Sequence, residues 1–486
     1  MNLKNLWGAL IVLLIIALPV FGHLSELAIQ TWDESRLAVN AFEMFKTRNW
    51  WVTTFMWQPD MWNTKPPLLI WLQVASLKIF GINELAIRIP SAIAAVITCL
   101  FMYWFLVKRF QNKLLAIAAP AILIVSEGYT RLHGIRTGDY DALLTMFTTM
   151  YILYFYLYLK EFKPRYLLLT AVTLTLACLT KGIHALIFMP ALLALAIYYK
   201  RLPRILTSWA FYTGLVFFIV IIPGYYLLRE YHNPGYLAAV AQNELGGRFF
   251  GVLENHREPA EFYFMWLYQS GAMWLLLYAW GMNMSVRSKS EEIRNLAAYL
   301  TVAALSFLVI ISFAETKLFW YVIPTYPLLS ILAAIAVHSI FTPVPKSKDK
   351  KYIILVVSAV IVYLLAYNNI LNNVLKPQVN KYDRLNAIIE YIKEGMAGKR
   401  DIRKAGIVYG EYQQDIIWYE HVCDGISYKN FQDFKQGEHA IVRTDEAAAV
   451  IRDMYDCELV HDHYGVKIYE INGWKKKTET EADTLK

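Results

Sequence analysis

The chain has 486 residues, of which 57% are hydrophobic and 15% aromatic, and its mean hydropathy is +0.35. Soluble globular domains carry a smaller apolar fraction, so the sequence predicts a polytopic membrane protein. The net charge of +8 does not indicate a nucleic-acid partner, because Lys and Arg stand in short clusters between apolar runs and no recognition motif accompanies them. Four cysteines exclude a disulfide-rich scaffold.

Apolar runs recur along most of the chain, and we expect eleven of them to cross the roughly 30 Å hydrocarbon core of a bilayer. They are residues 6–22, 87–107, 114–126, 142–159, 166–180, 183–199, 205–228, 262–284, 296–313, 318–341 and 352–371. No small-residue cleavage site follows the first run, so we expect it to be retained as a span rather than removed as a signal peptide.

The short basic connectors set the expected orientation. Lys and Arg cluster at residues 108–113, 160–165, 200–204, 287–294 and 346–351, which all fall on the side of Lys4 if the spans alternate. The positive-inside rule makes that side cytoplasmic. The N-terminus is then inside, and the first long loop and the C-terminus are outside.

Four irregular segments meet on the predicted outside face: residues 23–86, 127–141, 229–261 and 314–317. In the first, Thr31 and Glu34 have the spacing of a capping box ahead of a helical pattern over 37–45. Residues 68–80 are too short to span and predict a helix lying at the interface, ended by Gly81.

The composition becomes that of a soluble protein beyond Pro377, and we expect domains at 1–375 and 376–474 with a disordered tail at 475–486. Helices are predicted at 382–396 and 444–454, strands at 406–409 and 439–442, and a hairpin at 459–471. The fold class is therefore an α-helical polytopic membrane protein with a small C-terminal α/β domain. Cys423 and Cys457 would form a disulfide there if the compartment is oxidising.

Each charged residue at this face has a structural and a functional interpretation. Asp33 and Glu34 would favour the positive end of a helix dipole, or would serve an active site beside Lys65 and five tryptophans between Trp32 and Trp62. Asp139 and Asp141 would cap a span, with Arg131 and Arg136 neutralising them, or would be catalytic. The same two readings, structural or functional, apply to the others: Glu244 and Arg248 as an i, i+4 pair, Lys181 and Lys317 as snorkelling cations, and His256 as an interfacial histidine or a metal ligand.

Several motifs follow one another on this face. They are Asp33-Glu34 before a helix, Lys65-Pro66, Phe80-Gly81 with Glu84 and Arg88-Ile-Pro-Ser91, Thr137-Gly-Asp-Tyr-Asp141, Thr180-Lys-Gly182, Glu244 with Arg248 and His256, and Thr316-Lys-Leu-Phe-Trp-Tyr321. Over about residues 6–333 this order resembles the polyprenyl-phosphate-dependent glycosyltransferases of the GT-C type, in particular the aminoarabinose transferases and protein mannosyltransferases.

The resemblance implies an enzyme that moves a hexose or pentose from a polyprenyl (undecaprenyl) phosphate to a lipid A-like, glycan or protein acceptor, at the periplasmic face of the bacterial inner membrane. It implies inverting single-displacement chemistry, with Asp33, Asp141 and Glu34 as catalytic acids. The implied donor-phosphate contacts are Lys65, Arg36, Arg136, Lys181, Arg248, Lys317 and Tyr321. The aminoarabinose enzymes carry Glu before the Lys-Pro where this chain has Thr64, which weakens the case for a divalent metal ion bound with His256.

A transporter or flippase for lipid-linked sugars is an alternative, since it would also gather polar groups in a membrane cavity. Transporters place ionisable residues near the middle of broken spans and often show internal repeats, whereas this charge lies at one face and no repeat is seen. A structural assembly subunit is a third reading and does not account for the order of the motifs.

Overall fold

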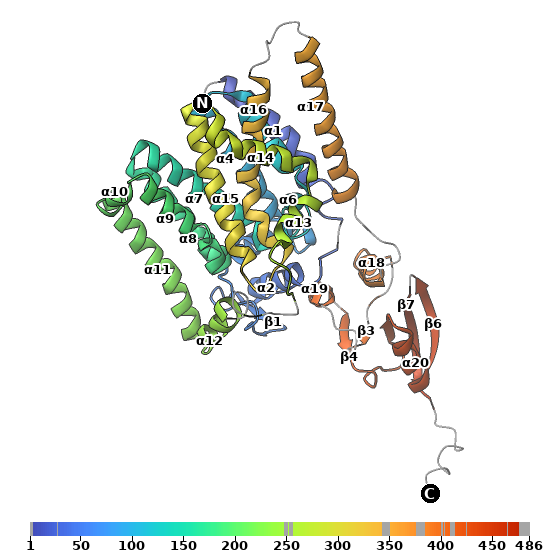
Figure 1. Ribbon diagram of the computed structural model, residues 1–486. Helices are drawn as coiled ribbons and strands as arrows, with labels where there is room; N and C mark the ends of the chain where they lie inside the picture. The colour runs from blue at the N-terminus through green and yellow to red at the C-terminus, as the bar shows by residue number, and fades with distance from the viewer. Residues whose placement is uncertain are drawn as a thin grey trace. The chain divides into compact units, whose positions relative to one another are not determined.

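The computed structural model describes residues 3–26, 28–246, 251, 256–342, 350–375, 384–399, 402, 404–408, 414–423, 425–463 and 465–475. The chain divides into two compact units (Figure 1). The larger unit comprises residues 1–24 and 43–376, and the smaller unit comprises residues 25–42 and 377–486.

The larger unit is a helical bundle. Its first half contains α1 (Leu3–Phe21), the end of α2 (Asp33–Thr47), the two-stranded β1 (Thr54–Phe55) and β2 (Gln58–Pro59), α3 (Leu68–Phe80), α4 (Glu84–Phe110), α5 (Lys113–Ile124), α6 (Glu127–Thr130), α7 (Tyr140–Glu161) and α8 (Pro164–Lys181). The 3₁₀ turn η1 (Gly182–Leu186), α9 (Met189–Tyr198), α10 (Leu202–Leu206), α11 (Trp209–His232), α12 (Tyr236–Val240) and the π-helical η2 (Ala241–Gly246) follow. The remainder is α13 (Phe262–Gln269), α14 (Ala272–Arg287), α15 (Glu291–Ser312), the 3₁₀ turn η3 (Phe319–Thr325), α16 (Tyr326–Phe341), α17 (Lys350–Asn369) and the π-helical η4 (Ile370–Leu375).

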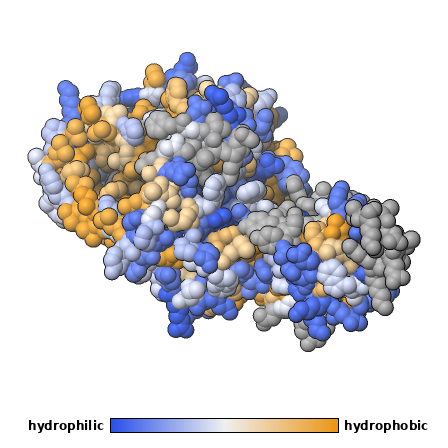
Figure 2. All heavy atoms as spheres, turned by 90° about the horizontal axis from the view of Figure 1, so that it is seen from below, coloured by the Kyte–Doolittle hydropathy of each residue, from blue (hydrophilic) through white to orange (hydrophobic). Residues whose placement is uncertain are grey.

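Among the described residues, seven helical segments are long and apolar enough to cross a membrane. The segments at 209–232 and 350–375 have mean hydropathies of 1.9 and 2.2, yet only 11% of each window is buried. An apolar surface of that extent is stable when it faces lipid. Figure 2 shows hydrophobic residues exposed over one flank of the larger unit, with hydrophilic residues beside them. The chain is thus a membrane-embedded protein.

The predicted spans correspond to the observed helices with four exceptions. Seven of the eleven lie in the long segments, while the spans predicted at 6–22, 114–126 and 183–199 lie in the shorter apolar helices α1, α5 and α9. The span predicted at 262–284 is not one helix. It is broken at Ser270 and Gly271 into α13 and α14, where the φ and ψ of Gly271 are −177° and 44° and no longer helical. The helix predicted at 68–80 is confirmed as α3, followed by Gly81 with φ of 81°.

The smaller unit contains a five-stranded sheet with strand order β4-β3-β5-β7-β6. Its elements are α18 (Arg384–Met396), β3 (Ala405–Val408), α19 (Gln414–Val422), β4 (Ile426–Lys429), β5 (His439–Val442), α20 (Asp445–Met454), β6 (Tyr455–His463) and β7 (Val466–Trp474). β3 pairs in parallel with β4 and β5, while β7 is antiparallel to β5 and β6. This confirms the predicted α/β domain, and α19 and β4 are the elements that the sequence did not predict.

The beginning of α2 packs with the C-terminal part of the chain in this same unit. The Phe42 ring lies edge-on to Trp418 at a centroid distance of 6.0 Å, and the Ile29 amide donates to the Tyr419 hydroxyl at 3.1 Å. The predicted capping box differs in one respect. Glu34 reaches back as expected, but its carboxylate accepts the Gln30 amide at 2.8 Å, and the helix begins at Asp33.

The predicted disulfide is wrong, because Cys423 and Cys457 are both thiols in the structure. Cys423 follows α19, which packs against the edge strand β4, whereas Cys457 lies in β6 at the opposite edge. Four strand spacings separate these edges, roughly 19 Å in all. The Cα atoms of a disulfide must approach within about 7 Å, so the sheet order keeps the two apart.

Candidate active site

Charged, polar and aromatic residues from five separate stretches of the chain meet at one end of the larger unit, and Figure 1 shows the elements that carry them at the end opposite the N-terminus. The start of α7 and the end of α8 meet there, because the two helices are antiparallel neighbours joined by a short turn at their other ends. Residues 63–65, the π-helical η2 and the turn η3 complete the region.

Asp141 and Lys181 form the tightest ion pair of this region. The Lys181 ammonium lies 2.6 and 2.8 Å from the two carboxylate oxygens of Asp141, and the two side chains are 5% and 4% exposed. Asp141 stands in the first turn of α7 and Lys181 in the last turn of α8, so each charge also opposes the partial charge of its own helix end. Buried charges require such partners, because desolvation alone costs several kcal/mol per ion.

Lys65 has a looser counter-ion in Glu244. Its ammonium is 3.4 Å from Glu244 Oε1, with the side chains 13% and 6% exposed. The Thr64 hydroxyl donates to the same oxygen at 3.2 Å, and His184 Nδ1 lies 3.8 Å from Glu244 Oε2. Glu244 therefore connects the first long loop with the turn that follows α8.

Aromatic and amide groups join these two ion pairs into one assembly. The Tyr321 ring lies 5.4 Å from the Lys181 ammonium and 5.2 Å from the His184 ring. Lys65 lies 5.8 Å from the Tyr140 ring, whose hydroxyl exchanges hydrogen bonds with the Asn63 amide at 3.0 and 3.1 Å. We call this assembly the polar chain; its members are Asn63, Thr64, Lys65, Tyr140, Asp141, Lys181, His184, Glu244 and Tyr321.

Neighbouring residues fix the backbone that carries Lys65. The Tyr236 hydroxyl donates to the Thr64 carbonyl at 2.7 Å, and burial raises the pKa of Tyr236 far above its usual value, so this donor keeps its proton. The buried Arg229 binds Thr53 through its hydroxyl at 2.9 Å and its carbonyl at 3.3 Å, and also the Asp60 carbonyl at 3.2 Å.

Gly182 has φ of 57°, a conformation that favours glycine, and so lets the chain turn directly after Lys181.

Asp139 belongs to a second, smaller cluster. It precedes α7 but makes no side-chain capping bond, contrary to the structural reading. Its carboxylate instead accepts the Thr137 hydroxyl at 2.5 Å and lies 3.3 Å from His133 Nδ1. The His133 ring stacks on Trp320 at 3.8 Å with an interplanar angle of 11°. This arrangement holds an imidazole in a fixed orientation beside a carboxylate.

Several predicted residues are held by other groups. Arg131 pairs with Glu127 at 2.8 Å, and Arg136 lies 3.3 to 3.4 Å from the carbonyls of Pro19 and Val20 at the end of α1. The Lys317 ammonium donates to the Ala314 carbonyl at 2.7 Å. These contacts give Arg136 and Lys317 a part in ending helices.

The remaining predicted residues fall into three groups. Asp33, Glu34 and Arg36 lie in the first turn of α2 and belong to the smaller unit, with Asp33 exposed and Glu34 buried. His256 is exposed, and within the described part of the chain it belongs to no group of three metal-ligating side chains. Arg248 lies outside the described residues, so the predicted pair with Glu244 does too.

Sequence reasoning missed the contributions of Asn63, Tyr140 and His184. Asn63 directly precedes Thr64-Lys65, and His184 follows Lys181 by three residues, so both flank motifs that were singled out. A polar side chain next to a motif was therefore the signal by which the sequence could have identified Asn63 and His184. Their contacts, however, depend on packing between residues more than 70 positions apart, such as Asn63 and Tyr140.

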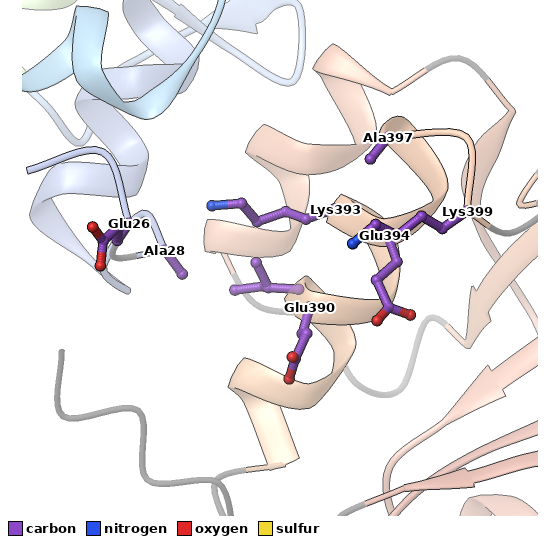
Figure 3. A pocket seen from close by; sticks show the side chains of 8 residues that line it. Glu26, Ala28, Glu390, Lys393, Glu394, Ala397 and Lys399 are labelled. Atoms are coloured by element: carbon purple, nitrogen blue, oxygen red, sulfur yellow. The ribbon is translucent and has the colours of Figure 1, made fainter. Parts of the chain in front are cut away.

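The smaller unit contains a hollow of about 330 Å³ between Glu26 and Ala28 on one side and α18 with the residues that follow it on the other (Figure 3). Carboxylates and ammonium groups of Glu26, Glu390, Lys393, Glu394 and Lys399 surround it. Glu26, Glu390 and Lys399 are exposed, so water screens their charges. The buried polar chain of the larger unit is the stronger candidate for chemistry.

Residues 64–226 match the dolichyl-phosphate-mannose-protein mannosyltransferase family. A protein of Aquifex aeolicus is 24% identical over 327 residues, which cover 67% of this chain and 63% of that protein. The undecaprenyl phosphate-alpha-4-amino-4-deoxy-L-arabinose arabinosyl transferase of Aeromonas salmonicida is 27% identical over 314 residues, which cover 63% and 55%. The chain therefore spans between half and two thirds of the length of these relatives.

The crystal structure of ArnT from Cupriavidus metallidurans bound to undecaprenyl phosphate matches with a TM-score of 0.74 at 13% identity, over 95% of this chain and 97% of that one. The chain thus has the GT-C fold of membrane glycosyltransferases. Its sequence similarity lies with the polyprenyl-phosphate glycosyltransferases of the aminoarabinose-transferase type, and this confirms the resemblance found in the motifs.

Proposed function

We propose that this chain is a membrane glycosyltransferase that moves a sugar from a polyprenyl-phosphate donor to a lipid, glycan or protein acceptor. The observation that supports this most directly is the polar chain, where the buried ammonium group of Lys181 and the partly buried ammonium group of Lys65 lie at one end of a GT-C bundle. Each lies beside a carboxylate and an aromatic ring. Ammonium groups in such a setting suit an anionic phosphate, which can take the place of a carboxylate.

The proposed step is a single displacement at the anomeric carbon. An acceptor oxygen forms the new bond to that carbon while the bond to the phosphate oxygen breaks, and the polyprenyl phosphate leaves. Asp33 takes the acceptor proton, a role that rests on the resemblance, with Glu34 and Asp141 as the other proposed acids. Charge on the leaving phosphate is offset by cations and a hydroxyl. The proposed contacts are Lys65, Lys181 and Tyr321, then Arg36, Arg248 and Lys317, with Arg136 in a supporting position.

The metal ion expected at His256 has little support from Thr64 and His256. Thr64 brings a neutral hydroxyl, a poor ligand for a divalent cation, to the position where the aminoarabinose enzymes carry Glu. His256 is exposed and belongs to no group of three ligand side chains among the described residues. We therefore derive no step through a metal.

We further propose the bacterial inner membrane as the location, with a cytoplasmic N-terminus and a periplasmic C-terminal domain. The basic connectors 108–113, 160–165 and 287–294 support this orientation. The polar chain then opens to the periplasm, where lipid-linked sugars are used.

The test is a transfer assay with membranes that contain the chain. Radiolabelled polyprenyl-phosphate sugars are added, and the lipid, glycan and protein fractions are separated. We expect label in one fraction, dependent on the chain. A flippase would move labelled donor across proteoliposome membranes without attaching label to an acceptor, and that result would replace the proposal. No contact in the described residues favours the flippase.

A further inference from the structure

The smaller unit joins the start of α2, which carries Asp33, to α19 from the C-terminal part of the chain. We propose that α19 positions Asp33 for proton transfer through the side chains of Trp418 and Tyr419, which contact α2 and the segment before it. This inference rests on the proposed function, in which Asp33 takes the acceptor proton, and deepens it by giving the C-terminal domain a part in the reaction. Trp418 and Tyr419 act through α2, so they are positioning residues.

Tyr419 fixes the chain just before α2. Its hydroxyl accepts the Ile29 amide at 3.1 Å, and both residues are 1% exposed. A buried amide needs an acceptor, because leaving it without one costs the full desolvation penalty of the group. The Tyr419 hydroxyl therefore sets the position of Ile29, although 390 positions separate the two in sequence.

Hydrogen bonds within residues 29–36 carry this constraint to Asp33. The Gln30 amide donates to the Glu34 carboxylate at 2.8 Å, and the Gln30 carbonyl accepts the Ser35 amide at 3.0 Å. Asp33 lies inside this closed turn. A displacement of the segment before the helix therefore moves the backbone of Asp33 as well.

Trp32, which directly precedes Asp33, has a strained backbone. Its φ is 74°, in the left-handed region that bulky residues rarely adopt. Its carbonyl accepts the Ser35 hydroxyl and the Arg36 amide, each at 3.0 Å. Such a conformation persists where the surroundings hold it, and its release would turn the peptide that leads into Asp33.

A second contact with α19 lies beyond Asp33 along α2. The Phe42 ring lies edge-on to Trp418 at 6.0 Å and to His421 at 5.7 Å, measured between ring centroids. Phe42 and Trp418 are both buried. Buried groups of α19 thus hold the chain on both sides of Asp33, while Asp33 itself is exposed and accessible to a substrate. A base that must meet the acceptor in one geometry needs such a support.

The test compares kcat and KM of purified full-length variants in the transfer assay. Tyr419→Phe removes the acceptor of the Ile29 amide. Phe42→Leu removes the ring that contacts α19. We expect each to lower kcat about tenfold, because an error of about 1 Å in the position of a reacting group can cost about a hundredfold. KM for the donor and for the acceptor should stay near wild type, since neither variant alters a proposed substrate contact.

Tyr455→Phe is the matched control. It removes a hydroxyl from another buried tyrosine of the smaller unit, one that packs with Phe434 and Trp474 at the sheet. Its kcat and KM should equal those of wild type.

Combination with Asp33→Asn separates positioning from folding. If Tyr419 acts through Asp33, adding Tyr419→Phe to Asp33→Asn should lower single-turnover transfer by less than about twofold, because coupled effects are not additive. A merely structural role would lower transfer equally in both backgrounds, together with the melting temperature in detergent, and that result overturns the inference.

Two further results would contradict a positioning role. One is full kcat in Tyr419→Phe, and the other is a raised KM for the acceptor at unchanged kcat, which would assign α19 to acceptor binding. Should Phe42→Leu fail to fold, Tyr419→Phe decides alone. Wild type that transfers no label contradicts the proposed function itself.

Discussion

Lys181 and Lys65 show how two residues of one type can differ in their part in one site. Lys181 is almost fully enclosed and paired with both oxygens of Asp141, while Lys65 is looser and more exposed. We infer that Lys181 supplies a fixed positive charge and anchors α7 to α8.

Asp141→Asn should destabilise the chain and abolish transfer. It leaves the Lys181 ammonium buried without its carboxylate, and breaking a buried pair in this way costs about 3 to 5 kcal/mol. Thermal unfolding in detergent and the transfer assay measure the two effects separately.

The double variant Asp141→Asn/Lys181→Met separates stability from catalysis, because it removes both charges. We expect most of the stability to return and transfer to stay absent. Recovery of transfer along with stability would show that Asp141 has only a structural part.

Asp33→Asn should abolish transfer while the protein remains folded. Asp33 lies in the first turn of α2 and is exposed, so its charge adds only about 0.3 to 1 kcal/mol through the helix dipole. Loss of a general base lowers the rate by about a hundredfold or more. The transfer assay with purified protein measures this.

Glu26→Gln is the matched control for Asp33, because it changes an acid earlier in the same loop. Its transfer rate should stay near that of wild type. Full turnover by Asp33→Asn would assign that residue to the helix end alone.

Among the elements, α14 and α16 make the closest backbone approach that depends on a glycine. A Cβ at Gly281 would lie 2.0 Å from the Leu332 carbonyl oxygen, so Gly281→Ala must push the helices apart. We expect a loss of about 1 to 3 kcal/mol, measured by thermal unfolding in detergent. Gly224→Ala in α11 is the control, since nothing lies within 4 Å of a Cβ there. Equal stability of the two variants would contradict this packing.

Strands β4 and β5 are linked across β3 by Lys429 and Glu438, 2.6 Å apart. Burial acts to raise the pKa of Glu438, but hydrogen bonds from Lys429 and the Lys435 amide outweigh it and leave the pKa below its usual value. A lowered folded-state pKa contributes stability above the unfolded value of 4.5, and this stability is lost as pH falls through the folded-state pKa.

Glu438→Gln should therefore lower the protection of β4 and β5 by about 1 kcal/mol at neutral pH. Below about pH 4 the difference should shrink. Hydrogen exchange on the full-length chain measures both. Asp445→Asn, which breaks the exposed pair with Lys467, should change protection little at either pH. A difference for Glu438→Gln that grows in acid would refute the linkage.

The sequence predicted most elements because their signals are local. Apolar length identified the long helices, and the helix predicted at 444–454 is α20, where Thr444 accepts the Ala447 amide as the N-cap. The missed α19 and β4 are short, with weak periodicity. Asp141 and Lys181 were both found, but their pairing was not, because Arg131 and Arg136 were nearer in sequence. Which cation meets which carboxylate depends on the packing of α7 against α8.

For the whole molecule, the proposed function requires one orientation in the membrane, with the polar chain on the periplasmic side. Reporter fusions after Lys65, Asn255 and Lys381 should report outside, and fusions after Lys113, Arg204 and Lys348 inside, as the basic connectors predict. A cytoplasmic reporter at Lys65 would place the polar chain on the side away from the proposed acceptors and would overturn the assignment.

The start of α2 packs with residues near the end of the chain, as the contact between Phe42 and Trp418 shows. After Phe42 the ribosome must add 376 residues to reach Trp418 (418 − 42), which takes roughly 20 to 75 s at 5 to 20 residues per second. Asp33 therefore lies in a segment that cannot reach its final packing until synthesis is nearly finished. A nascent chain could insert its membrane helices early while the start of α2, which carries the proposed base Asp33, still lacks its final packing. We therefore expect a prematurely terminated product to have no transferase activity.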